Sequence, residues 1–417
     1  MPVERIDLGK GSYSNVEEIS TRSGVSALLQ NGYIDDLGSN VKIWGGELWS
    51  SFLFGGVTGG RVHGMFYSTT LQTLIVVHEG TVYSIDSDGN QTELTGETLT
   101  PGPRVEFFEA PALTQAGVYG PNVFMANGGS IYYTDGSTVS KLTGTNAPSA
   151  CRAIKFIDYQ LIAQYDKRFF VHSEPNDLLN LGDSTNLIAA DSSPDDIVGI
   201  ATANRELIVF GKRSIDTFYY SSIGTTATWV KTPGGFNPDY GCAASGSIVE
   251  FGNAVFFLDH KREVCQYSGR QVKVLSTSIS MEIEQLTTVS DAIADKVDFN
   301  GKHFYWLTFP TENKTFVYDM VMDCWYRMGD WDNDVGVLNA HPMNAYAYND
   351  DANLYLGGTR DGVISKLNTD ATIFLNETSR FIRRSGFINW GTDRRHKRCN
   401  MIAFRVKSGQ ELSLIHI

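Results

Sequence analysis

Short runs of apolar residues, separated by polar turn residues, recur along most of the chain. The segment Ser193–Tyr220 shows the pattern most clearly, with apolar stretches at Ile197–Thr202 and Leu207–Gly211 and a third, mixed stretch at Ser214–Tyr220. Short runs rich in Ile, Val, Phe and Tyr and bounded by Gly, Asn or charged residues are typical of β-strands. The segment is therefore predicted to form three antiparallel strands, a β-meander.

Similar apolar strands recur at a regular spacing, with successive gaps of 49, 38, 46, 48, 49 and 50 residues. A repeat of several short strands with such a period is the sequence signature of β-propeller blades. We therefore predict an all-β fold, a β-propeller of about six to seven blades; a pair of β-sandwiches with accidental spacing is the alternative. The strands that define the spacing begin at Leu74, Val123, Leu161, Leu207, Val255, Phe304 and Leu354.

The repeat covers only the middle of the chain. Residues 1–60 have weak, glycine-rich strand signals and are predicted to form an irregular N-terminal arm or platform, followed by the propeller over residues 61–370. Residues 371–411 are predicted to be a basic, β-rich C-terminal platform or docking segment. The last residues, Leu412–Ile417, resemble a translated sequencing adapter, so the natural chain is expected to continue differently. Helix is expected only at Ser280–Val289, with a second short stretch at Ser290–Asp295.

Composition fits many strands joined by tight turns, since the 417 residues include 12% aromatics and 41 glycines. No run of eighteen apolar residues occurs and the N-terminus lacks a signal-peptide core, so we expect no membrane insertion and synthesis in the cytoplasm. The five cysteines are scattered without C-x-x-C spacing, which predicts buried thiols.

The net charge of −13 hides a basic strip near the C-terminus. Between Arg380 and Lys407 there are nine basic residues and one acid, whereas residues 1–379 carry 25 basic and 45 acidic groups. An acidic protein with one basic strip suggests docking onto another acidic surface, such as a second copy of the chain. An ordinary solvated face and direct DNA binding are the alternatives. The predicted subunit or adaptor contact comprises Arg380, Arg383, Arg384, Arg394, Arg395, Lys397 and Arg398.

No motif in the sequence indicates catalysis, a cofactor or a metal. The run Asp86–Asn90 begins like a calcium loop but lacks the later acidic ligands, so it predicts a hairpin turn. The cluster Asp330–Asp334 around Trp331 suits a sugar or metal site, or a simple turn. Phosphate loops, hydrolase elbows and zinc motifs do not occur. We therefore predict a protein that is not an enzyme, with no catalytic, cofactor-binding or metal-binding residues.

Three segments resemble the packaged-DNA stabilisation proteins of short-tailed phages, which form the tail hub or nozzle. The first segment, Ser193–Tyr220, is similar to that family's signature in three runs, Pro194-Asp-Asp-Ile-Val-Gly-Ile, Ile208-Val-Phe-Gly and Ser214-Ile-Asp-Thr-Phe-Tyr. The stretches Val272–Ser280 and His303–Trp325 match later parts of the pattern. The resemblance covers Arg152 to Met328 well and the rest loosely.

The resemblance implies a structural virion protein of the phage tail that forms a ring, expected to be a hexamer, around a channel for DNA. It implies portal–adaptor proteins and tail fibres or spikes as partners, retention and ejection of packaged DNA, and no sequence-specific DNA binding. An acidic channel wall would keep DNA from adhering. Two other functions stay open: a cellular propeller that binds proteins, and a propeller enzyme acting on polysaccharide if Asp330–Asp334 lies over the central channel.

Overall fold

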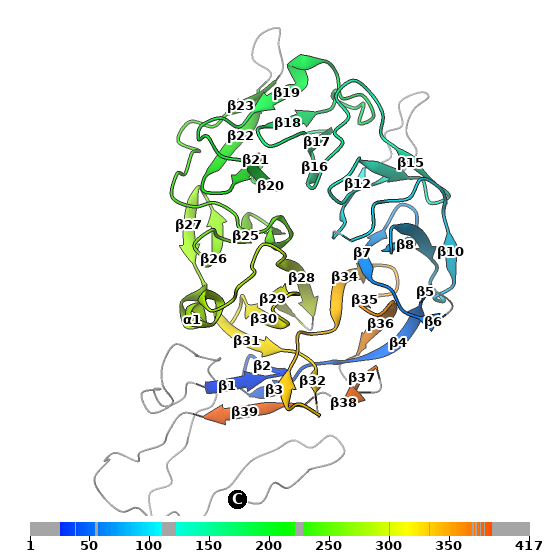
Figure 1. Ribbon diagram of the computed structural model, residues 1–417, viewed down its shortest axis with the longest axis vertical. Coiled ribbons are helices and arrows are strands. Elements are labelled where there is room, and N and C mark those ends of the chain that lie inside the picture. Colours follow the sequence, from blue (N-terminus) through cyan, green and yellow to red (C-terminus); the bar gives the residue numbers. More distant parts are fainter. Residues whose placement is uncertain are drawn as a thin grey trace, which may run out of the picture.

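Seven β-sheets are arranged around a central axis, as the computed structural model of the chain shows (Figure 1). Each sheet is a blade built on a meander of consecutive antiparallel strands, and the first strand of the meander is innermost, which is the architecture of a β-propeller. The predicted fold is confirmed, with seven blades. The structure describes residues 26–37, 39–54, 57–102, 104–110, 122–221, 228–299, 301–332, 334–368, 371, 373–375, 377–378 and 380–385.

The first three blades follow one another along the chain. Blade 1 contains β7 (Val62–Ser68), β8 (Thr73–His78), β9 (Thr81–Ile85) and β10 (Gln91–Glu93). Blade 2 contains β12 (Glu106–Ala110), β13 (Asn122–Ala126), β14 (Tyr132–Thr134) and β15 (Thr138–Lys141), with β11 (Thr95–Gly96) parallel to β15 at its outer edge. Blade 3 contains β16 (Ile154–Ile157), β17 (Gln160–Gln164), β18 (Phe169–His172) and β19 (Leu187–Ala189).

The next three blades repeat the same meander. Blade 4 contains β20 (Ile197–Ala203), β21 (Glu206–Gly211), β22 (Ile215–Ser221) and β23 (Thr228–Lys231). Blade 5 contains β24 (Val249–Phe251), β25 (Ala254–Leu258), β26 (Val264–Ser268) and β27 (Gln271–Val274). Blade 6 contains β28 (Ile293–Phe299), β29 (Lys302–Phe309), β30 (Lys314–Asp319) and β31 (Cys324–Met328).

The last blade takes its outer strand from the N-terminal part of the chain. Blade 7 contains β34 (Met343–Asn349), β35 (Leu354–Thr359) and β36 (Val363–Asn368), and β4 (Gly45–Ser51) pairs antiparallel with β36. The predicted boundary at residue 60 therefore does not coincide with the edge of the propeller. The pattern of neighbouring residues did not predict β4 as a blade strand, because its partner strand lies more than 300 positions away in the sequence.

Strands near both ends of the described chain extend blades 6 and 7 outward (Figure 1). In blade 6, β1 (Ser26–Gln30) pairs parallel with β31, and β39 (Ile382–Ser385) pairs antiparallel with β1. In blade 7, β37 (Ile373–Phe374) pairs with β4 and with β38 (Glu377–Thr378). We call these added strands, with the hairpin of β2 (Gly32–Ile34) and β3 (Asn40–Lys42), the platform.

The remaining elements are short. Two further hairpins join β5 (Leu53–Phe54) to β6 (Val57–Thr58) and β32 (Trp331–Asp332) to β33 (Val337–Leu338). Within the described residues the helices are η1 (Ser184–Asn186), η2 (Ser245–Ser247), η3 (Ser276–Ser278) and α1 (Ser280–Glu284). The second predicted helix is wrong, because β28 begins at Ile293 and pairs with β29 along its whole length. No helix in the described part of the chain is long and apolar enough to cross a membrane.

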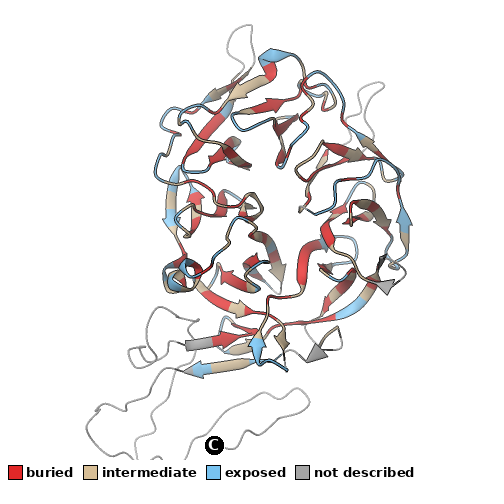
Figure 2. Cartoon of the chain, viewed as in Figure 1, coloured by how far each residue is buried: buried red, intermediate tan, exposed pale blue. Residues whose placement is uncertain are grey.

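The described residues form seven hydrophobic core clusters, one between each pair of neighbouring blades, where buried residues gather (Figure 2). One of them joins Val62 and Leu74 of blade 1 to Leu356 and Ile364 of blade 7, so the ring of blades is closed. Another packs Trp44 and Ile34 of the platform region against blades 6 and 7. Because apolar side chains fill both faces of every sheet, each blade depends on its neighbours for burial.

Candidate functional site

The basic strip begins on the platform. Arg383 and Arg384 lie in β39, the last strand of the extended blade 6 sheet, where they pair with Leu29 and Leu28 of β1. The Arg384 side chain is exposed and that of Arg383 is partly buried. The other predicted contact residues, Arg394, Arg395, Lys397 and Arg398, lie outside the described residues.

Arg380 is the third described member of the strip. Its guanidinium lies 4.2 Å from the ring centre of Trp331 in β32, a cation–π contact. This contact places the predicted acidic cluster beside the platform, and none of its described members lines the cavity of the central channel. Asp332 Oδ1 accepts hydrogen bonds from Asp334 N at 2.9 Å and Val335 N at 3.0 Å, as in a turn. Among the described residues, no group of three or more His, Cys, Asp or Glu is arranged to hold a metal ion.

The second candidate region is the channel enclosed by the inner strands. A cavity of about 770 Å³ lies there, lined by residues of all seven blades. Lys155 of β16 forms ion pairs with Glu106 of β12 at 2.5 Å and with Glu250 of β24 at 3.3 Å. Glu250 also accepts a hydrogen bond from Thr202 N of β20 at 2.6 Å. Lys155 thus connects blades 2, 3 and 5, and the hydrogen bond from Thr202 to Glu250 connects blade 4 to the same cluster.

Burial and neighbouring charges shift the pKa values of Glu106 and Lys155 in opposite directions. Burial raises the pKa of Glu106, and the charge of Lys155 offsets only part of that shift. Burial alone would lower the pKa of Lys155, but Glu106 and Glu250 outweigh it and raise the pKa. Lys155 is therefore charged at neutral pH, where it offsets part of the charge of the two carboxylates.

A second ion pair crosses the channel. Arg104, just before β12 of blade 2, pairs with Asp295 in β28 of blade 6, and these two blades are not neighbours in the ring. The side chains of opposite blades therefore meet across the channel. A double helix, whose major groove alone is about 12 Å wide, cannot pass through an opening that one lysine or arginine side chain bridges.

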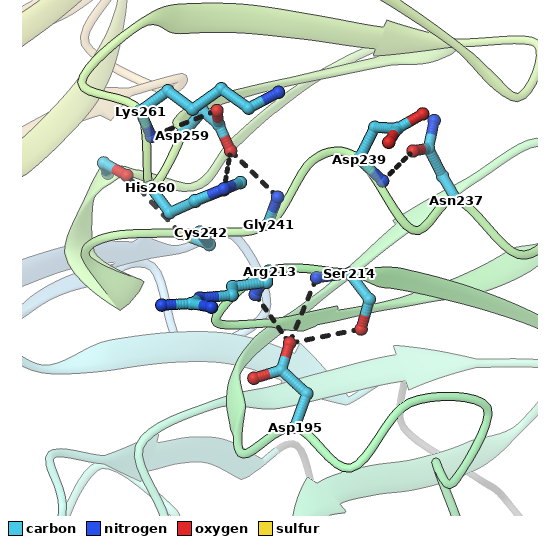
Figure 3. A network of polar contacts seen from close by, with 11 residues as sticks. Asp195, Arg213, Ser214, Asn237, Asp239, Gly241, Cys242, Asp259, His260 and Lys261 are labelled. Atoms are coloured by element: carbon cyan, nitrogen blue, oxygen red, sulfur yellow. Dashed lines mark hydrogen bonds and ion pairs between the residues drawn. The ribbon is translucent and has the colours of Figure 1, made fainter.

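The residues of the family-like motif have a structural role at the turns of blades 4 and 5 (Figure 3). Asp195 Oδ2 accepts hydrogen bonds from Arg213 N at 2.6 Å and Ser214 N at 3.1 Å, which fixes the turn between β21 and β22. A side chain at Gly211 would collide with this carboxylate, since an added Cβ would lie 2.5 Å from Asp195 Oδ2. The motif therefore specifies the shape of a blade.

A buried carboxylate fixes the neighbouring turn in the same way (Figure 3). Asp259, which is fully buried, accepts from Gly241 N at 2.8 Å and Lys261 N at 3.2 Å, and lies 2.7 Å from His260 Nδ1. Lys261 in turn lies over the ring of Tyr240, 4.5 Å from its centre. The run Asp86–Asn90 also forms the predicted turn, with Asp86 Oδ1 accepting from Asp88 N and Asn90 N at 2.9 Å.

Sequence reasoning missed three arginines at the mouth of the channel. Arg61 directly precedes β7, while Arg104 and Arg152 each stand two residues before β12 and β16. All three line the cavity. Their shared position before the first strand of a blade is a signal that the sequence contains, but it becomes visible only once the inner strands are known.

Comparison with known proteins gives the family. No curated protein matches the chain. Among solved structures, the computationally designed Ika8 protein is 13% identical over 77% of this chain and 99% of its own, with a TM-score of 0.47. The extracellular domain of a hybrid two-component system from B. thetaiotaomicron is 12% identical over 77% of this chain and 39% of its own, with a TM-score of 0.49. Raptor from Chaetomium thermophilum is 9% identical over 78% of this chain and 29% of its own, with a TM-score of 0.47.

The family is identified by a match of the amino-acid sequence to a family profile. The profile of the phage stabilisation family, described as "Bacteriophage P22 Gp10, beta-propeller", matches residues 56–372, from the hairpin before blade 1 to the end of blade 7. Since the match spans well over half of the 417 residues, the chain belongs to this family of phage structural, DNA-stabilising proteins.

Proposed function

We propose that the protein is a subunit of the phage tail hub or nozzle and is not an enzyme. In this role a ring of copies extends the portal–adaptor channel, retains packaged DNA, lets DNA pass during ejection, and supports tail fibres or spikes. The family supports a structural, DNA-stabilising role in the virion. Ring size, expected to be six, and the named partners go beyond the family match.

The observation that carries the proposal is the set of ion pairs across the propeller channel. Lys155 bridges Glu106 and Glu250, and Arg104 pairs with Asp295, so one propeller offers no passage for a double helix. A DNA conduit built from this protein must therefore lie between several copies. The acidic net charge of −13 suits the wall of such a conduit, because like charge prevents phosphate from adhering.

The platform is the surface that we propose for contact with neighbouring copies or with the adaptor. It brings strands from near both ends of the described chain beside blades 6 and 7, and its edge strand β39 carries Arg383 and the exposed Arg384. Arginine is favoured in protein interfaces because its planar guanidinium binds carboxylates and stacks on aromatic rings. The predicted contacts at Arg394, Arg395, Lys397 and Arg398 stay part of this proposal.

The test is assembly with purified portal–adaptor complex, followed by light scattering and negative-stain imaging. The wild-type protein is expected to join the adaptor as a ring. The variant R380E/R383E/R384E should fail to join, whereas K167E/R168E/R213E, which reverses three exposed cations on turns of blades 3 and 4, should assemble normally. A wild-type protein that stays monomeric and ignores the adaptor would refute the proposed function. Normal assembly of the platform variant would refute only the placement of the contact.

A further inference from the structure

A second cavity lies at the end of the channel opposite the mouth that carries the three arginines. The inner strands of all blades run in the same direction, because each blade repeats the same meander. The last residues of β28 in blade 6 and of β34 in blade 7 therefore stand at this far end. The cavity between them measures about 290 Å³, at the lower end of the range for small-molecule sites. Its lining consists of Lys296, Asp298, Tyr346, Ala347, Tyr348 and Tyr355.

One wall of this cavity is aromatic and open to solvent. Tyr348 is 37% exposed, and its ring centre lies 4.7 Å from that of Tyr355. Phe299, the last residue of β28, packs edge-on against Tyr355, with 5.7 Å between the ring centres. The hydroxyl of Tyr348 donates to Asn353 Oδ1. The ring of Tyr348 is therefore held in place while part of its surface stays accessible to a ligand.

The polar side chains of the cavity are accessible as well. The side chain of Asp298 is 30% exposed and accepts from Lys296 Nζ and from His303 Nδ1, each at 2.7 Å. A carboxylate accepts about four hydrogen bonds and an ammonium group donates three. Asp298 and Lys296, whose side chain is 44% exposed, therefore keep hydrogen-bonding capacity for a ligand. The hydroxyl of Tyr355 accepts from Asp298 N at 2.8 Å and so connects this polar rim to the aromatic wall.

This combination of groups selects among classes of ligand. Lys296 disfavours a cation, and Asp298 disfavours an anion. A wholly apolar ligand would remove both charged groups from water without replacing their hydrogen bonds, which is costly. A neutral sugar meets each requirement, because its ring has an apolar face of C–H groups and a rim of hydroxyls that both donate and accept hydrogen bonds.

We propose that this cavity binds one ring of a neutral sugar. The apolar face of the sugar would lie against the ring of Tyr348, while neighbouring hydroxyls accept from Lys296 and donate to Asp298. His303 would hold the carboxylate of Asp298 in position, as it does in the free protein. The site lies within a single propeller and does not depend on ring formation or on the adaptor. It adds a binding function to the structural role of the protein.

The experiment is ligand-detected saturation-transfer NMR, with isothermal titration, on the purified full chain without the adaptor. The probes are the methyl glycosides of glucose, galactose, mannose and N-acetylglucosamine. At least one of them should bind with a dissociation constant of about 1 mM or below, and its ring C–H protons should receive the strongest transfer. Sorbitol, which has hydroxyls but no ring, and tetramethylammonium, a cation without hydroxyls, should bind at least about tenfold more weakly.

Two equally exposed tyrosines provide a matched pair of variants. Y348A should weaken binding of the sugar about tenfold or more, whereas Y348F, which keeps the ring, should bind like the wild type. Y219A, at a tyrosine of β22 that is 36% exposed and lines neither cavity, should also bind like the wild type. K296M should weaken binding about tenfold. Because K296M changes only an accessible side chain, it tests the site even if Y348A alters the fold.

Failure of all four glycosides to bind would overturn the proposal, as would equal losses of affinity in Y348A and Y219A. Tetramethylammonium binding as tightly as the best sugar would indicate a cation site, and sorbitol doing so would show that the face of the ring is not recognised. Either result would also overturn it. None of these results bears on assembly with the adaptor, which is the test of the proposed function.

Discussion

Asn31 Nδ2 donates a hydrogen bond to the backbone carbonyl of Arg380, 2.9 Å away and 349 positions later in the chain. The same side chain accepts from Gly329 N at 2.8 Å through Oδ1, and the residue is 1% exposed. Its φ of +52° lies in the left-handed region, which asparagine tolerates better than most residues. Asn31 thus joins the N-terminal segment, the end of blade 6 and the beginning of the basic strip.

Replacing Asn31 with alanine should destabilise the platform. N31A leaves the buried Gly329 N–H without a partner and puts alanine at a positive φ, so we expect a loss of about 2–4 kcal/mol in the free energy of unfolding, measured in urea. N31D retains the acceptor for Gly329 but cannot donate to Arg380, and should lose less. Equal stability of N31A and the wild type would show that this junction does not support the fold.

Closure of the ring depends on a close approach at Gly358 of β35. An added Cβ there would lie 2.6 Å from both Met65 Sδ and Val62 Cγ1 of blade 1. G358A should therefore separate blades 7 and 1 and lower the free energy of unfolding by about 1–3 kcal/mol. The control is G129A, where the nearest atom would be at 3.5 Å, an ordinary contact. If both variants melt at the same temperature, the approach at Gly358 is not tight in solution.

The buried ring of His341 should make stability depend on pH. It packs edge-on against Trp306 and Phe374, with ring centres 5.1 Å apart in each pair, and burial lowers its pKa to about 3. Below the ordinary histidine pKa of about 6.5, His341 is protonated in the unfolded chain but stays neutral in the folded protein. Stability contributed by the neutral ring is thus complete above pH 6.5 and is lost towards pH 3, by up to about 1.4 kcal/mol per pH unit.

The measurement is the slope of the free energy of unfolding between pH 6.5 and 4. H341N removes the titrating group, so its slope should be smaller than that of the wild type even if the variant is less stable throughout. An unchanged slope in H341N would show that His341 is not buried in the neutral form.

The charge of Lys155 in the channel should stabilise the folded protein. K155M leaves Glu106 and Glu250 facing each other without a cation, and should cost about 3 kcal/mol of stability at pH 7. Adding E106Q and E250Q removes the uncompensated charge and should restore most of that loss. Thermal unfolding of the single and triple variants checks this, and a triple variant less stable than K155M would contradict the charge explanation.

The sequence pattern predicted the blades, but it did not show that β4 completes the last blade of the ring. Leu74, Val123 and Leu207 each lie in the second strand of a blade, which is apolar on both faces and therefore recognisable without its partners. The strand β4 looked irregular because Gly46 makes room for Phe374, since an added Cβ would lie 2.7 Å from that ring. Such a contact cannot be inferred from neighbouring residues.

The candidate sites show the same limit. Arg380 was predicted from charge, but its contact with Trp331 depends on a hairpin that only the fold brings near. Lys155, Glu106 and Glu250 lie on three different blades, and nothing in their spacing indicates a cluster. Charge runs are visible in a sequence, whereas charges gathered by a ring of strands are not.

The pairing of β4 with β36 also affects how the protein is made. The strand Gly45–Ser51 leaves the ribosome before its partner Val363–Asn368, which is synthesised about 300 residues later, after roughly 15–60 s at about 5–20 residues per second. During that interval the nascent chain carries an incomplete ring with an unpaired strand, a state open to aggregation. A strand that is translated before every other strand of the seven meanders is therefore among the last to pair.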